Sequence, residues 1–185
     1  MNAEDVLDFW FAGDPTVWRQ QRWFVRDDGF DAEISSRFAL AVEAARDGAL
    51  DSWAATAAGA LALVIVLDQF PRNLFRGSHL AFAGDAHARR IARAALPWAG
   101  ALSPVQRVFL YLPFEHSEDL ADQDRSVALF ESLRGAGDVE ATIDYAHSHR
   151  EVIARFGRFP HRNAALGREN TPEEEAYLAE PGAGF

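Results

Sequence analysis

The feature that most constrains this sequence is an apolar run in its first half. From Ala57 to Leu67 the run is interrupted only by Gly59. It is too short to span a bilayer, which takes about 20 apolar residues in a helix. It is also apolar on every side of a helix, which is typical of a buried helix. We therefore predict a central helix from Asp51 to Leu67, ended by Phe70-Pro71, because the residue before a proline is biased away from the helical conformation.

The rest of the chain also shows helical periodicity, and no stretch alternates as a strand would. The spacing of apolar residues and of capping residues predicts further helices at Ala3–Ala12, Phe30–Ala45, Ala81–Leu96, Ser103–Leu112, Glu118–Leu133, Val139–Phe156 and Pro172–Leu178. The connections between them are short. We predict an all-α fold: a compact array of seven or eight antiparallel helices forming a single domain over residues 1–185.

The composition excludes several classes of function. The chain has 28 acidic and 18 basic residues and a formal net charge of −10, which argues against a nucleic-acid-binding surface. It has no cysteine and no lysine, so thiolate chemistry, disulfides, Schiff bases and a phosphate loop are all excluded. The N-terminus is acidic and lacks the basic region of a secretory signal. We predict a cytoplasmic protein without a membrane partner, and the sequence does not predict an oligomeric state.

Positive charge is nevertheless concentrated in the stretch RFGRFPHRNAALGR, residues 155–168. One interpretation is a solvated basic turn. However, Phe156, Phe159 and Leu166 flank the polar residues and indicate that the turn is anchored on the core. Anchored arginines could then form a pocket for an anion.

Asp68 is the polar residue whose position is most unusual. It follows five apolar residues at the end of the central helix, where the helix dipole disfavours a carboxylate. If it is buried, it needs a cationic partner, and Arg72 lies four residues further on. Asp68 could form an ion pair within the core, or it could orient an arginine toward a ligand.

The block FLYLPFEHSEDLADQDR, residues 109–125, contains the best candidate for proton transfer. His116 and Gln123 fall in an apolar stripe, and Glu118 lies beside the histidine. We expect Pro113 to break or kink the helix, with Ser117 as the cap of the next one. His116 could be a general base, a metal ligand or a hydrogen-bonded structural histidine. The histidines and acids lack the spacing of a metal site, and the motifs of serine hydrolases and nucleotide-binding proteins are missing, so we predict no metal and no cofactor.

Four motifs in order resemble the bacterial domain of unknown function 924 family: LDFWF, LALVIVLDQFPRNLFRG, FLYLPFEHSEDLADQ and HREVIARFGRFPHRNAALGR. The resemblance extends from Val6 to about Leu178. It implies an all-α fold similar to tetratricopeptide-repeat-like superhelices, and it brings no established activity. The chain departs from the family's pattern at Glu115, where a neutral residue is more frequent. The polar positions that match the motifs are Asp68, Gln69, Arg72, Asn73, Arg76, His116, Ser117, Glu118, Gln123, His149, Arg150, Arg158, His161, Arg162, Asn163 and Arg168.

Two hypotheses follow. In the first, the chain binds a small anionic molecule, and as an enzyme it would use His116 and Glu118 as the proton-transfer pair. Its predicted ligand-binding residues are Asp68, Arg72, Asn73, Arg76, Arg150, Arg158, His161, Arg162, Asn163 and Arg168. In the second, the chain is a peptide- or protein-binding helical scaffold, and the same residues form a structural ion-pair network.

Overall fold

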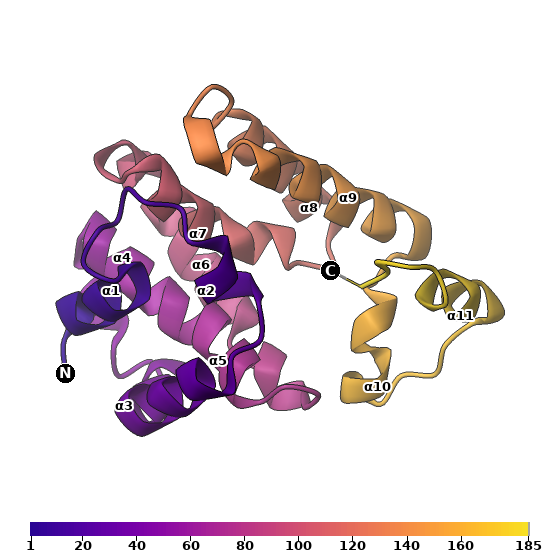
Figure 1. The fold of residues 1–185 in the computed structure, drawn as a ribbon, viewed down its shortest axis with the longest axis horizontal. Coiled ribbons are helices and arrows are strands. Elements are labelled where there is room, and N and C mark those ends of the chain that lie inside the picture. Colours follow the sequence, from indigo (N-terminus) through magenta and orange to yellow (C-terminus); the bar gives the residue numbers. More distant parts are fainter. Residues whose placement is uncertain (185) are drawn as a thin grey trace.

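The computed structural model describes residues 1–184 and confirms the all-α prediction (Figure 1). Within these residues there is no strand. The α-helices are α1 (Ala3–Phe11), α2 (Gln20–Phe24), α3 (Asp28–Arg46), α4 (Ala57–Val64), α5 (Phe70–Leu74), α6 (Asp85–Ala95), α7 (Pro104–Glu115), α8 (Leu120–Glu131), α9 (Ala141–Phe156), α10 (Asn163–Leu166) and α11 (Pro172–Leu178). Short 3₁₀ turns lie at Asp51–Ala55, His79–Phe82, Leu96–Ala101, Gly137–Val139 and Pro160–Arg162. The predicted number of helices was too low, because α2, α5 and α10 are too short to show a period in the sequence.

The central helix differs from its prediction at both ends. The Asp51–Ala55 turn is separate from it, and α4 begins after Thr56, whose side chain accepts a hydrogen bond from the Gly59 amide. At the other end the helix does not stop before Pro71. It widens into a π turn at Ile65–Gln69 and continues as α5. The proline is tolerated because it lies in the first turn of α5, where its missing N–H breaks no hydrogen bond.

Pro113 does not end α7, contrary to our expectation. The helix continues to Glu115, and His116 is its C-cap. Nearly all of α7 from Val105 onward is buried, and this burial offsets the hydrogen bond that an internal proline removes, a cost of about 3 kcal/mol. The cap of the next helix, α8, is Asp119 and not Ser117.

The core surrounds α4, against which α1, α6 and α7 pack. Its aromatic part comes from α1, α2, α3 and α7, with Phe9, Trp10, Trp23, Phe38 and Phe109 among the buried rings. Helices α7, α8 and α9 pack side by side, and α10 and α11 lie at the end of the molecule away from the N-terminus (Figure 1). None of the helices in residues 1–184 is long and apolar enough to cross a bilayer. The arrangement brings the C-terminal ends of α7 and α9 next to α5 and the Pro160–Arg162 turn.

Candidate functional site

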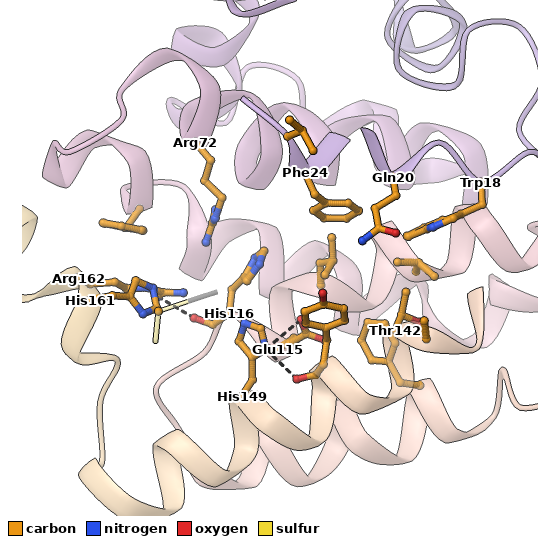
Figure 2. Close-up of a pocket in the computed structure, with 18 residues that line it drawn as sticks. Trp18, Gln20, Phe24, Arg72, Glu115, His116, Thr142, His149, His161 and Arg162 are labelled. Carbon is orange, nitrogen blue, oxygen red and sulfur yellow. Dashed lines mark hydrogen bonds and ion pairs between the residues drawn. The ribbon is translucent and has the colours of Figure 1, made fainter. Parts of the chain in front are cut away.

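A cavity of about 450 Å³ opens where these elements meet. At one end its walls carry titratable side chains: Arg72, Glu115, His116, His149, His161 and Arg162 (Figure 2). At the other end its walls are mostly apolar and aromatic. Four residues predicted for the site from the sequence line this cavity, namely Arg72, His116, His161 and Arg162.

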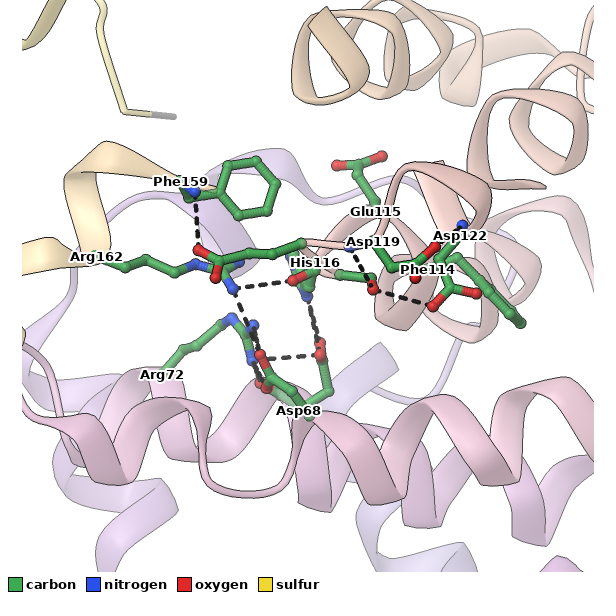
Figure 3. Close-up of polar contacts among 12 residues, drawn as sticks. Asp68, Arg72, Phe114, Glu115, His116, Asp119, Asp122, Phe159 and Arg162 are labelled. Carbon is green, nitrogen blue, oxygen red and sulfur yellow. Dashed lines mark hydrogen bonds and ion pairs between the residues drawn. The ribbon is translucent and has the colours of Figure 1, made fainter. Parts of the chain in front are cut away.

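Asp68 lies beneath the cavity on the π turn and is completely buried. Its carboxylate lies 2.9 and 3.0 Å from Nδ1 of His116, accepts a hydrogen bond from Gln69 Nε2 at 2.6 Å and lies 3.3 Å from Arg72 (Figure 3). Burial alone would raise the pKa of Asp68, but the Arg72 charge and the hydrogen bonds from His116 and Gln69 outweigh burial and hold that pKa well below its usual range. Asp68 is therefore ionised and serves as the buried acceptor for the His116 ring.

His116 is held as a neutral base. Burial lowers its pKa, and the Arg72 charge lowers it further, against the opposing effect of Asp68. Because an ionised carboxylate can only accept, Nδ1 of His116 carries the proton and Nε2 keeps a lone pair. Nε2 makes no hydrogen bond within residues 1–184, and the ring lines the cavity. The end of α7 that carries this histidine is fixed by Gln123, whose Nε2 donates to the Glu115 and Ser117 carbonyls at 2.7 Å each.

The two arginines of the cavity differ in how fully they are paired. Arg72 donates two hydrogen bonds to the carboxylate of Asp85, each 2.9 Å long, and a third to the main-chain carbonyl of Asp68. Arg162 is buried and donates one hydrogen bond from Nη1, to the His116 carbonyl at 2.9 Å. Its ion pair with Asp85 is long, at 3.8 Å, and its Nε has no partner among the described residues. Burial, together with the Arg72 charge, lowers the pKa of Arg162 to about 10, so Arg162 is a buried cation with incomplete compensation.

Glu115 is the second buried acid of the cavity. Burial, reinforced by the Asp68 charge, raises its pKa to about 8, so the group is protonated at neutral pH. Its Oε1 lies 3.3 Å from Nδ1 of His149, and its Oε2 has no hydrogen-bond partner in residues 1–184. Burial lowers the pKa of His149 to about 3 and that of His161 to about 4, so both rings are neutral. The polar end of the cavity thus contains neutral donors and acceptors beside one incompletely paired cation.

Other predicted site residues hold the C-terminal segment together and do not line the cavity. Glu118 accepts two hydrogen bonds from Arg168, at 2.7 and 2.9 Å, and one from the Phe159 amide at 2.8 Å. Burial would raise the pKa of Glu118, but the Arg168 hydrogen bond and its other partners lower it overall. Arg158 pairs with Glu174. Asn163, which is buried, accepts a hydrogen bond from Arg168 and donates one to Asn170 at 2.8 Å.

Three further predicted residues lie elsewhere. Asn73 and Arg76 both bind Asp31, which ties α5 to α3. Arg150 pairs with Asp124 on the exposed surface of α8 and α9. The structure thus separates the predicted residues into a group at the cavity and a group of inter-helix ties.

Sequence reasoning missed Asp85 completely and did not assign Glu115 or His149 to the site. The sequence feature that could have pointed to Asp85 is its position directly after Gly84, at the start of α6. A Cβ at residue 84 would lie 2.2 Å from the Leu67 carbonyl oxygen, so only glycine allows the start of α6 to approach the π turn this closely. No three histidines or acids among the described residues are placed to hold a metal ion.

Comparison with known proteins identifies the family of this chain but assigns no activity to it. A solved structure of a protein of unknown function, ATU0120 from Agrobacterium tumefaciens, is 44% identical, with a TM-score of 0.86 over 96% of each chain. The search of curated proteins found no match. The model of the family described as "Bacterial protein of unknown function (DUF924)" matches residues 6–182, and the chain belongs to this family.

Proposed function

We propose that the cavity binds a small anionic ligand at Arg162 and that His116 accepts a proton from this ligand or from a water molecule beside it. The observation that carries the proposal is the buried, incompletely paired guanidinium of Arg162 facing a cavity. A buried charge is costly unless it is paired and hydrogen-bonded. An anion would supply the partner that the described residues do not.

Arg72 contributes less to binding than the sequence predicted. Its guanidinium already has Asp85 and the Asp68 carbonyl as partners. Its positive charge still lies close to the cavity, and it helps to keep His116 neutral. The protonated Glu115 carboxyl can donate a hydrogen bond to the same anion, because one of its oxygens has no partner within residues 1–184.

The Asp68–His116 pair gives the site its capacity for proton transfer. A carboxylate bound to Nδ1 fixes the tautomer of an imidazole and stabilises the imidazolium that forms when Nε2 accepts a proton. The pair therefore replaces the predicted pair of His116 and Glu118 in our proposal. If the protein is an enzyme, its reaction begins with proton transfer to His116.

The second hypothesis, a structural network, is supported for a different set of residues. Arg158, Arg168 and Glu118 satisfy one another and the main chain, as residues of a structural network should. We propose that these residues maintain the C-terminal segment and do not contact the ligand.

The test is a thermal-shift and calorimetric screen of inorganic phosphate, sulfate and small carboxylates against the wild type and Arg162→Gln. A ligand at ten times its Kd stabilises the folded state by about 1.4 kcal/mol, which raises Tm by roughly 3–6 °C in a chain of this size. We expect at least one anion to produce such a rise in the wild type and none to produce it in Arg162→Gln.

Arg76→Gln is the matched control, because Arg76 also forms ion pairs but lies away from the cavity, on Asp31. This substitution should lower the Tm of the unliganded protein and leave the anion-induced rise intact. An anion effect that survives in Arg162→Gln, or that disappears equally in Arg76→Gln, would refute the proposed site. Circular dichroism of each variant establishes that it is folded before binding is measured.

A further inference from the structure

The walls of the cavity change from polar to apolar along its length. On α7, Val108, Leu112 and Glu115 all line it. These residues are spaced by four and three positions, so they share one face of the helix. The rise of 1.5 Å per residue places Glu115 about 10 Å beyond Val108. The cavity is therefore long enough for a ligand with two chemically different ends.

Helix α9 also lines the cavity with residues of one helix face. Thr142, Tyr145 and His149 line the cavity at spacings of three and four, and His149 meets Glu115 of α7. Because α7 and α9 are each antiparallel to α8, they run in the same direction, and their polar residues lie at the same end. Both helices thus place a carboxyl or imidazole group at one end of the cavity, and α7 places its apolar residues at the other.

The segment around α2 closes the apolar end. Trp18, Phe24 and Val25 line the cavity there, and the last two side chains are about half exposed. Figure 2 shows Phe24, Gln20 and Trp18 at the opposite side of the cavity from Arg162 and His161. Phe130 of α8 completes this wall. The polar groups at this end are those of Trp18, Gln20, Thr142 and Tyr145, and the remaining wall is apolar.

We propose that the natural ligand is an amphipathic monocarboxylate, with its carboxylate at Arg162 and a hydrocarbon or aryl body along α7 toward Phe24. This inference rests on the proposed anion site and extends it by naming the class of ligand. At about 30 Å³ per non-hydrogen atom, the cavity of 450 Å³ holds roughly fifteen such atoms. An eight-carbon to ten-carbon acid fits this volume, whereas acetate or phosphate would leave the apolar end unfilled.

Isothermal titration with acetate, butyrate, octanoate and neutral 1-octanol tests the inference. Each buried methylene contributes about 0.8 kcal/mol, or close to fourfold in Kd, so octanoate should bind on the order of a hundredfold more tightly than butyrate. 1-Octanol should bind far more weakly than octanoate, because it has no charge to pair with Arg162. We expect Arg162→Gln to remove this advantage of octanoate over octanol.

Val25→Asp places a charge at the apolar end and should weaken octanoate at least tenfold while leaving acetate binding unchanged. Val17→Asp is the matched control, since Val17 is similarly exposed in the same segment and does not line the cavity. It should change neither ligand. Acetate binding also shows that the Val25 variant retains a folded site.

The outcomes separate this inference from the proposed function. If acetate, butyrate and octanoate bind equally and all lose affinity in Arg162→Gln, the anion site stands and the amphipathic ligand is refuted. If octanoate and octanol bind equally, with no effect of Arg162→Gln, both proposals fail. If none of the carboxylates binds but phosphate or sulfate does, the anion site stands and the amphipathic ligand is refuted; if no anion binds, both proposals fail.

Discussion

The buried carboxyl of Glu115 should make the protein less stable as the pH rises through neutrality, and Glu115→Gln should remove this effect. Glu115 is a buried residue in the wall of the cavity, close to the ionised Asp68 and to the neutral His149. Glutamine has the same shape and cannot ionise. The substitution therefore isolates the consequence of the charge.

The magnitude follows from the two protonation states. The pKa of the glutamate carboxyl rises from its ordinary value of 4.5 to about 8 on folding. Below the lower value the group is protonated in both states and contributes no pH dependence. Between the two values the unfolded chain releases a proton that the folded protein keeps, so the free energy of unfolding falls with rising pH. At 1.36 kcal/mol per pKa unit, the loss over this window amounts to roughly 4–5 kcal/mol.

Chemical denaturation of the wild type and Glu115→Gln at several pH values between 4.5 and 9 measures the effect. His149 and His161 also contribute to the pH dependence, because they titrate in this range in the unfolded chain, but they do so in both proteins. The difference between the two unfolding free energies therefore reports Glu115. We expect the variant to gain roughly 4–5 kcal/mol relative to the wild type by pH 8, equivalent to roughly 10–20 °C in Tm.

Glu118→Gln is the matched control for this prediction. The pKa of Glu118 is lowered on folding, so its contribution is fully present above its ordinary pKa and is lost only as the pH falls through its lower folded value. Its difference profile should therefore be flat between pH 6 and 8. If the Glu115→Gln profile is equally flat there, Glu115 ionises at its ordinary pKa, and our description of the buried end of the cavity is wrong.

Two further predictions concern the packing around the site. Gly84→Ala should lower the free energy of unfolding by about 1–3 kcal/mol or more, because its Cβ would lie 2.2 Å from the Leu67 carbonyl oxygen. Gly100→Ala is the control and should have little effect, because no atom lies within 4 Å of its added Cβ. Equal denaturation midpoints for the two variants would contradict the close approach of α6 to the π turn. Arg168→Ala should lower the free energy of unfolding by about 1–3 kcal/mol, because it leaves the half-buried Glu118 without its cation. An unchanged urea midpoint would show that this ion pair is not a structural tie.

The helical content and the partners of the unusual residues were largely accessible from the sequence, because they follow from local patterns. The period of 3.6 predicted most of the longer helices, and the burial of Asp68 predicted a cation, which the structure supplies in Arg72. What failed was the effect of the two prolines. Pro71 and Pro113 were expected to stop helices, but Pro71 lies in the first turn of α5, and the cost of Pro113 is outweighed by burial that depends on neighbours distant in the sequence.

Which arginines form structural ion pairs and which one is incompletely paired could not be predicted from the sequence either. Arg158, Arg162 and Arg168 occur in the same short stretch of the sequence and have the same chemistry. Their roles depend on which carboxylates α6, the loop between α7 and α8, and α11 bring to them, and only the tertiary structure determines this. Glu174 pairs with Arg158 and Glu118 pairs with Arg168, whereas Arg162 lies over the Phe82 and Phe159 rings, donates to a carbonyl and has only a long ion pair, with Asp85.

This division makes the two hypotheses complementary. Two short segments, one after α7 and one after α9, bind each other in both directions: Arg162 donates to the His116 carbonyl, and the Phe159 amide donates to Glu118. Arg168 completes the link by binding Glu118 and the Phe159 carbonyl. These bonds fix the backbone that carries Arg162. The Arg162 side chain is therefore already largely ordered in the folded protein, before a ligand binds. A ligand anion that meets a preorganised cation loses less of its binding energy to ordering. We infer that the structural ion pairs of the C-terminal segment are what allow one buried arginine to remain available for a ligand.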